Sequence, residues 1–126
     1  MSSPSDLRYT ETHEWVRMQD GIATIGVTQF AVDELTDVTF VQMKKVGTKI
    51  ATGDQIGEVE SVKATSDIYS PIAGEVVEVN TSLDDDASAV NDEPYGSGWL
   101  VKIKATDPAE ADALMNADAY DAKYAG

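Results

Sequence analysis

Residues 57–79 read Gly57-Glu58-Val59-Glu60-Ser61-Val62-Lys63-Ala64-Thr65-Ser66-Asp67-Ile68-Tyr69-Ser70-Pro71-Ile72-Ala73-Gly74-Glu75-Val76-Val77-Glu78-Val79. Two apolar residues lie at equal distance from the pair Lys63-Ala64, which predicts an antiparallel hairpin with that pair at its tip. The predicted cross-strand pairs are Val59 with Ile68, Ser61 with Ser66, and Glu60 with Asp67. The apolar pair stabilises a half-buried hairpin, whereas two carboxylates directly opposite each other destabilise it. The stretch therefore predicts a lysine presented at an exposed turn, beside two acidic residues that the sheet itself does not need.

The residues around Lys63 distinguish it from an ordinary solvated lysine, which is the commonest interpretation of a lysine in a sequence. The segment 60–64 (Glu-Ser-Val-Lys-Ala), followed by the segment 70–80 (Ser-Pro-Ile-Ala-Gly-Glu-Val-Val-Glu-Val-Asn), resembles the lipoyl-attachment hairpin of glycine cleavage system H proteins. Glu60, three residues before the lysine, and Gly74, eleven after it, occupy the places where lipoyl domains carry a glutamate and a glycine. The related biotin carriers flank their lysine with methionines. Valine and alanine stand there in this chain, which argues against biotin.

Length and composition indicate one globular domain, residues 1–126, with a single core. The hydrophobic content is 42%, and no apolar run approaches the eighteen or so residues of a membrane span. The sequence has no cysteine, so thiolate nucleophiles, thiolate metal sites and disulfides are excluded. Its one histidine, His13, argues against a histidine-based metal site or catalytic triad. We expect no catalytic residue and no metal site.

The chain is strongly acidic, with 23 Asp and Glu against 9 Lys and Arg and a net charge of −14. Such a surface repels nucleic acid and anionic membranes, and neither is an expected partner. The acidity has two interpretations. It provides solubility or suits a salty environment, or it steers the protein toward partners with basic docking faces.

Short alternating segments separated by Gly and Pro turns predict a mainly β fold. Beside the hairpin, the alternation around Trp15 within residues 7–18 predicts a strand with the indole turned inward. Further predicted strands are 22–27, 37–43 with Val38 and Phe40 on one face, 75–79 and 100–104. Thr28 is a favourable N-cap and predicts a short helix over 29–35. Residues 83–94 predict a polar acidic loop, in which three consecutive aspartates lack the spacing of a calcium loop.

The two ends of the chain are expected to differ in structure. Residues 1–6 predict a loosely held start, without the character of a signal peptide or a transit peptide. We therefore expect a cytoplasmic protein, or alternatively the mature form of a mitochondrial matrix protein. At the other end Asp107 as N-cap, Pro108 and Glu110 predict a helical segment over about 107–124 that packs on the barrel.

The resemblance to H proteins extends from Leu7 to about Tyr120. It includes His-Glu-Trp at 13–15 and Pro-Tyr-Gly-Ser-Gly-Trp at 94–99, and a family pattern between Thr28 and Gly47. This chain departs from that pattern at three places, which are Glu34, where some members carry histidine, Thr36 for glycine, and Met43-Lys44 for leucine-proline. The resemblance implies a barrel-sandwich hybrid of two small antiparallel sheets with short helices, one of them C-terminal.

The resemblance also implies a function, that of a non-catalytic carrier with lipoate amide-linked to Lys63. The implied partners are a pyridoxal-phosphate glycine decarboxylase, a tetrahydrofolate-dependent aminomethyltransferase, an FAD-containing dihydrolipoamide dehydrogenase, and a lipoate ligase or lipoyl transferase. Glu60 and Asp67 would be recognition residues, and Glu14 and Asp67 would shelter the loaded arm. The expected oligomeric state is a monomer.

Two other classes of function stay open from the sequence. The chain could be a free-standing lipoyl module that serves a 2-oxo acid dehydrogenase or a lipoate relay, although its N-terminal motif and its C-terminal helix favour the glycine system. It could also be an enzyme that uses Lys63 as a Schiff-base nucleophile. Such a lysine is normally desolvated, whereas this one lies at an acidic, exposed tip.

Overall fold

Two antiparallel sheets make up the computed structural model, which describes residues 6–124 except for the side chains of Asp84 and Pro108. The larger sheet has the order β1 (Arg8–Tyr9), β2 (Glu14–Gln19), β3 (Ile22–Val27), β9 (Val101–Ala105), β8 (Gly74–Val79) and β5 (Lys49–Ile50). The smaller sheet has the order β4 (Val38–Met43), β6 (Gln55–Ser61) and β7 (Thr65–Tyr69). The expected mainly β sandwich is thus confirmed, and neither sheet closes into a barrel within the described residues. Residues 1–5 of the expected loose start lie outside this description.

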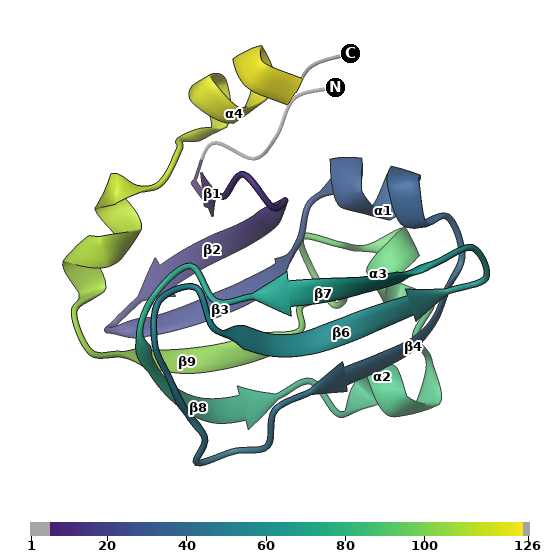
Figure 1. Ribbon diagram of the computed structural model, residues 1–126, viewed down its shortest axis with the longest axis horizontal. Helices are drawn as coiled ribbons and strands as arrows, with labels where there is room; N and C mark the ends of the chain where they lie inside the picture. Colours follow the sequence, from purple (N-terminus) through teal and green to yellow (C-terminus); the bar gives the residue numbers. More distant parts are fainter. Residues whose placement is uncertain (1–5, 125–126) are drawn as a thin grey trace.

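The main core is formed by the facing sides of the two sheets (Figure 1). Its buried members are Val16, Ala23, Ile25, Val27, Val32, Leu35, Val38, Val41, Ile50, Ile56, Val59, Ile68, Ile72, Val76, Leu83, Val90, Leu100, Val101 and Ile103. Those on β4, β5, β7 and β8 have exposed residues on both sides along the chain, as expected where a sheet is covered on one face. The core therefore holds the three-stranded sheet against the six-stranded one. The other face of the three-stranded sheet lies on the outside of the protein.

The segment 7–18, for which a strand around Trp15 is predicted, forms two strands. A turn at residues 10–13 separates β1 from β2, and His13 within it has a left-handed backbone with φ of 70°. The two strands then pair with each other, with Tyr9 opposite Trp15. The predicted strand around Trp15 is β2, and Trp15 is buried as predicted. Nothing in the alternation marks the reversal that precedes it.

Strand β4 keeps its predicted place but not its predicted facing. A β-bulge between Val38 and Phe40 shifts the pairing with β6, so that the next inward side chain is Val41. Phe40 is consequently 46% exposed, although simple alternation from Val38 places it inside. An extra residue in one strand reverses the facing of those that follow it.

Helix α1 (Gln29–Leu35) has the predicted bounds, and its N-cap Thr28 accepts a hydrogen bond from the Ala31 amide at 3.3 Å. The acidic segment 83–94 is not the predicted loop. It contains the short helices α2 (Ser82–Asp85) and α3 (Ala89–Asp92). Each helix buries one apolar side chain, Leu83 and Val90, and this burial orders an otherwise polar segment.

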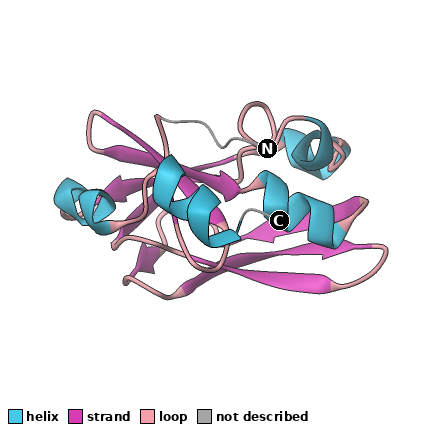
Figure 2. Cartoon of the chain, turned by 90° about the horizontal axis from the view of Figure 1, so that it is seen from above, coloured by secondary structure: helices cyan, strands magenta, loops and turns pink. Residues whose placement is uncertain are grey.

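The C-terminal segment is helical as predicted, with an interruption. A 3₁₀ helix, η1 (Pro108–Ala113), begins at the N-cap Asp107, which accepts from the Ala109 amide at 3.1 Å. The chain then pairs with β1 through a bridge between Tyr9 and Met115 before α4 (Ala117–Tyr124) begins. Figure 2 shows the chain from above, with helices (cyan) lying over and around the strands (magenta).

A second, aromatic cluster joins α4 to the rest of the protein. The Tyr120 hydroxyl lies 2.7 Å from His13 Nδ1 and 2.7 Å from Thr28 Oγ1, and its ring stacks on that of Tyr9. Burial raises the pKa of Tyr120 to about 12 and lowers the pKa of His13. In the same cluster Trp15 donates its indole N–H to the Pro94 carbonyl at 2.8 Å. Two of the motifs quoted above, at 13–15 and 94–99, are thus in direct contact.

Candidate functional site

The turn that carries Lys63 is held by Ser61. The Ser61 amide donates to the Ala64 carbonyl at 2.8 Å, which closes a four-residue turn over 61–64. The Ser61 hydroxyl oxygen accepts from the amides of Lys63 and Ala64 at 3.2 and 3.0 Å, and the hydroxyl donates to the Ala64 carbonyl at 2.9 Å. One side chain therefore fixes the backbone on both sides of the lysine. The sequence analysis assigns no role to Ser61, although serine is a common turn residue for this reason.

The hairpin is centred one position earlier than predicted. Its observed pairs are Gly57 with Ile68, Glu58 with Asp67, Val59 with Ser66, and Glu60 with Thr65. The central pair is consequently Val62-Lys63, and the predicted Lys63-Ala64 tip was wrong. Turn geometry sets hairpin register, and the turn closed by Ser61 overrides the apparent symmetry of Val59 and Ile68.

Lys63 is exposed at this turn, as predicted. The hairpin lies in the layer nearest the viewer in Figure 1, with its tip at the right-hand edge. Among the described residues the Lys63 amine forms none of the three ion pairs found. The amine is therefore accessible to a reagent or an enzyme without rearrangement of the fold.

The two acids beside the lysine occupy different surroundings. Glu60 is exposed on β6, with Phe40 of β4 on one side and Thr65 of β7 on the other. Asp67 is exposed on β7 and accepts hydrogen bonds from Gln55 Nε2 at 3.1 Å and from the Tyr69 hydroxyl at 3.4 Å. The predicted opposition of Glu60 and Asp67 is thus wrong, because the register places Glu58 opposite Asp67 instead.

Glu14 is a buried residue, only 1% exposed, at the start of β2. Its Oε1 accepts from the Thr10 hydroxyl at 2.6 Å and from the Thr12 hydroxyl, and its Oε2 accepts from the Tyr69 amide at 3.3 Å. Burial is the main influence on this carboxyl, and it raises the pKa of Glu14 although the hydrogen bonds oppose it. Glu14 lies at the end of β7 that is remote from Lys63.

The contact with Tyr69 gives Glu14 a structural role between the two sheets. Strand β7 is an edge strand of the smaller sheet, and successive amides of a strand point to opposite sides. The Ser70 amide donates toward Asp54, on the β6 side, so the Tyr69 amide points out of the free edge. Glu14 accepts this amide and so covers part of that edge, a known weak point of sheets. Through Tyr69, Glu14 and Asp67 belong to one connected set of hydrogen bonds.

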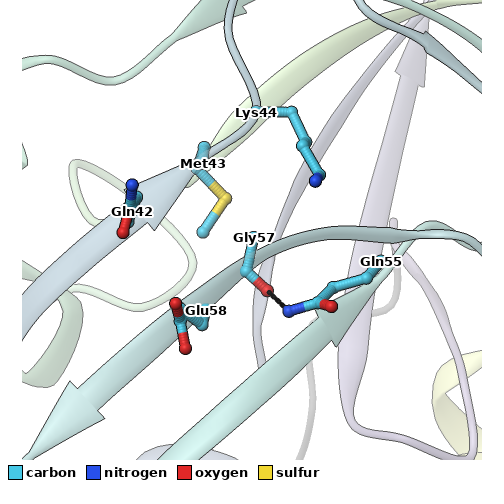
Figure 3. Close-up of a pocket in the computed structure, with 6 residues that line it drawn as sticks. All are labelled: Gln42, Met43, Lys44, Gln55, Gly57 and Glu58. Atoms are coloured by element: carbon cyan, nitrogen blue, oxygen red, sulfur yellow. Dashed lines mark hydrogen bonds between the residues drawn. The ribbon is translucent and has the colours of Figure 1, made fainter.

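A shallow hollow of about 150 Å³ lies between β4 and β6, at the end away from the Lys63 turn. Gln42, Met43, Lys44, Gln55, Gly57 and Glu58 line it (Figure 3). Gln55 donates from Nε2 to the Gly57 carbonyl at 3.3 Å, shown as a dashed line. The hollow is therefore separate from the lysine. Among the described residues, no group of three or more His, Asp and Glu is placed to hold a metal ion.

Comparison with known proteins gives one consistent result. The family model described as Glycine cleavage H-protein matches residues 7–125. The glycine cleavage system H protein of Alteromonas mediterranea is 53% identical over 119 residues, which are 94% of this chain and 92% of that protein. That of Alcanivorax borkumensis is 48% identical over 120 residues, 95% of this chain and 94% of that protein.

A solved structure extends the likeness to three dimensions. The crystal structure of a glycine cleavage system H protein from Mycobacterium marinum superposes with a TM-score of 0.89 at 38% identity. The match covers 96% of this chain and 98% of that one. Between residues 6 and 124, no helix of this chain has the length and apolar character needed to cross a membrane.

Proposed function

The chain belongs to the glycine cleavage H-protein family, the lipoyl carriers of the glycine cleavage system, and from this premise we propose that Lys63 carries the lipoyl group. The observation that supports this assignment most is the turn itself. Lys63 stands exposed at the tip of a hairpin, and the Ser61 hydroxyl fixes the backbone beside it.

The residues present suit an amide-linked lipoyl group. Acylation needs a free amine that projects from the fold, and the Lys63 amine meets that need. Acylation also removes the charge of the lysine, which costs no ion pair among those of residues 6–124. When bound, lipoate supplies a reducible disulfide at the end of a long flexible arm. The exposed lysine does not suit a Schiff-base nucleophile, which is normally desolvated.

We assign the chain a carrier role without catalysis of its own, in which it passes an aminomethyl group between enzymes. The proposed partners are a pyridoxal-phosphate glycine decarboxylase, a tetrahydrofolate-dependent aminomethyltransferase, an FAD-containing dihydrolipoamide dehydrogenase, and a lipoate ligase or lipoyl transferase. Attachment to a protein replaces free diffusion by a local concentration on the order of millimolar. The bacterial relatives support a cytoplasmic location.

The three acids have different proposed roles, in accordance with their surroundings. Glu60 is solvent-exposed close to the lysine, and we assign it to recognition by the attaching enzyme. Asp67 is proposed for both recognition and shelter of the arm, because it is exposed and hydrogen-bonds to Tyr69. Glu14 is buried and contributes to shelter indirectly, through its hold on the Tyr69 amide.

Replacement of Lys63 by arginine tests the attachment site. We expect Lys63→Arg to fold normally but to receive no lipoyl group, because the arginine side chain is not an acylatable amine at neutral pH. The free energy of unfolding should change by less than about 0.5 kcal/mol at this exposed position. Lys45→Arg, at an exposed loop lysine, is the matched control and should be modified like the wild type. Intact mass after expression with lipoate measures the outcome, and a lipoyl increment on Lys63→Arg would contradict the assignment.

A further inference from the structure

The outer face of the three-stranded sheet carries large apolar side chains that the core does not use. Phe40 on β4 is 46% exposed, and Val62 in the lysine turn is 69% exposed. The bulge in β4 turns Phe40 outward, and Val62 occupies the turn position directly before Lys63. Aromatic residues exposed beside a functional group are typical of interaction sites.

The register places Phe40 beside Glu60, and Val62 follows Glu60 closely along the chain. Phe40 lies directly opposite Glu60 across the β4–β6 pairing, where side chains are about 5 Å apart. Val62 follows Glu60 by two residues and lies one residue beyond the end of β6, in the turn itself. We call the set Phe40, Glu58, Glu60, Val62 and Asp67 the hairpin face. In Figure 1 no helix within residues 6–124 covers the sheet that carries it.

The charges of the hairpin face define the partner that it fits. Glu58, Glu60 and Asp67 are acidic, and the pairing puts Glu58 between Gln42 of β4 and Asp67 of β7. A complementary surface has an apolar recess for the phenylalanine ring with lysine or arginine around it, since complementary charges speed encounter and suppress wrong partners. The net charge of −14 favours the same kind of partner.

The distance to Lys63 selects one partner among several. Before acylation the lysine side chain reaches only roughly 6 Å from its Cα. An enzyme that acylates the amine must therefore bring its active site against the turn, and its surface then covers residues two or three positions away. Enzymes that act at the end of an attached arm are under no such constraint. Glu60 and Val62 are thus within the footprint of the attaching enzyme, and Phe40, which pairs with Glu60, lies next to them.

We propose that the hairpin face is the docking surface for the lipoate-attaching enzyme, with Phe40 and Val62 as apolar anchors around Glu60. The proposal rests on the proposed function of Lys63. The proposed surface that the enzyme contacts thus includes Phe40, which lies 23 positions before Lys63 in the sequence, in addition to the lysine and its flanking acids.

The test compares two exposed apolar strand residues. Phe40→Thr retains a β-forming residue and removes the ring. Val77→Thr is the control: it introduces the same residue at another exposed apolar strand position, a valine of β8 that is 37% exposed. A purified lipoate ligase with lipoate and ATP modifies the apo-proteins, and intact mass gives kcat/KM for each. We expect about a tenfold loss for Phe40→Thr, which corresponds to about 1.4 kcal/mol, carried by KM. Val77→Thr should match the wild type.

Further measurements separate the alternative outcomes. The thermal midpoint verifies that Phe40→Thr is folded, and Val62→Ser at the turn provides a second variant that does not depend on the sheet. Wild-type rates for both variants would overturn the proposal. The proposal would also be overturned if the two variants were lipoylated at the normal rate but loaded slowly by glycine decarboxylase. The hairpin face would then be a docking surface for that later enzyme. A wild-type protein that is not modified at Lys63 would instead refute the proposed function.

Discussion

Glu14 provides a direct test of how the two sheets are held together. Its buried carboxylate accepts three hydrogen bonds, two from threonine hydroxyls of the preceding turn and one from the Tyr69 amide at the free edge of β7. Glu14→Ala removes all three acceptor contacts, whereas Glu14→Gln retains the shape. In the glutamine variant the amide oxygen can accept from the Tyr69 amide, and the NH₂ group can donate to the Thr10 and Thr12 hydroxyl oxygens.

The size of the effect follows from these contacts. A buried donor that loses its acceptor costs about 1–3 kcal/mol. Tyr69 is 38% exposed, so water can replace part of the lost contact, and Thr10 and Thr12 remain within 3.2 Å of each other. Glu14→Ala also removes the cost of burying the carboxylate charge, which offsets a further part of the lost stability. We expect Glu14→Ala to lower the free energy of unfolding by about 1–2 kcal/mol, or the thermal midpoint by roughly 4–8 °C. Glu14→Gln should remain within about 1 kcal/mol of the wild type at pH 7.

The pH dependence has a definite sign. Burial raises the pKa of Glu14 in the folded protein above its ordinary value of 4.5. At a pH between 4.5 and the raised pKa, the folded protein therefore binds more protons than the unfolded chain. Stability due to this group therefore increases as the pH falls through the raised pKa toward 4.5, and it decreases as the pH rises. The wild type should gain stability relative to Glu14→Gln when the pH is lowered from 7 to 5.

Urea unfolding of the wild type and the two variants at pH 7 and pH 5 measures both effects. Lipoylation and aminomethyl loading of the same samples show whether function follows stability. An unchanged midpoint for Glu14→Ala, combined with slow loading, would refute the edge-covering role and leave Glu14 as a group that acts on the arm alone. A difference between wild type and Glu14→Gln that does not vary with pH would contradict the linkage argument.

Two further substitutions test the hairpin and the larger sheet. Glu60→Gln should keep the thermal midpoint, since Glu60 is exposed opposite Thr65, and should slow lipoylation; a lowered midpoint with an unchanged rate would contradict its role in recognition. Gly74→Ala should destabilise the fold by about 1–3 kcal/mol, because the added Cβ would collide with the Lys104 carbonyl and come within 2.5 Å of the Ile103 side chain. Urea unfolding measures this loss, and a wild-type midpoint would show that the sheet relaxes around the methyl group.

Elements that depend on local sequence were predictable. The helix over 29–35 follows from the Thr28 cap and the apolar spacing after it, and the structure has the same bounds. The turn between β2 and β3 follows from Asp20-Gly21, whose φ values of 54° and 79° are those of the tight hairpin turn that such a pair favours. The position of Lys63 at an exposed turn was likewise predictable from the sequence, because its surroundings resemble a known attachment hairpin.

Features that depend on contacts across the fold were not predictable. The bulge in β4 depends on how Thr39 fits against β6, where its hydroxyl donates to the Glu60 carbonyl at 3.3 Å. The helices over 82–92 depend on the pockets that receive Leu83 and Val90. The contact of Glu14 with Tyr69 joins residues 55 positions apart. Periodicity carries no information on any of these partners.

The corrected hairpin register separates the functions of the two acids near the lysine. With the centre at Val62-Lys63, Glu60 lies between Phe40 and Thr65, whereas Asp67 lies next to Glu58 and bonds to Gln55 and Tyr69. Glu60 thus belongs with the apolar residues that we propose as the docking surface of the attaching enzyme. Asp67 is at the margin of the hairpin face and is joined through Tyr69 to Glu14. We therefore expect loss of Glu60 to affect attachment of the lipoyl group first, and loss of Asp67 to affect the loaded arm as well.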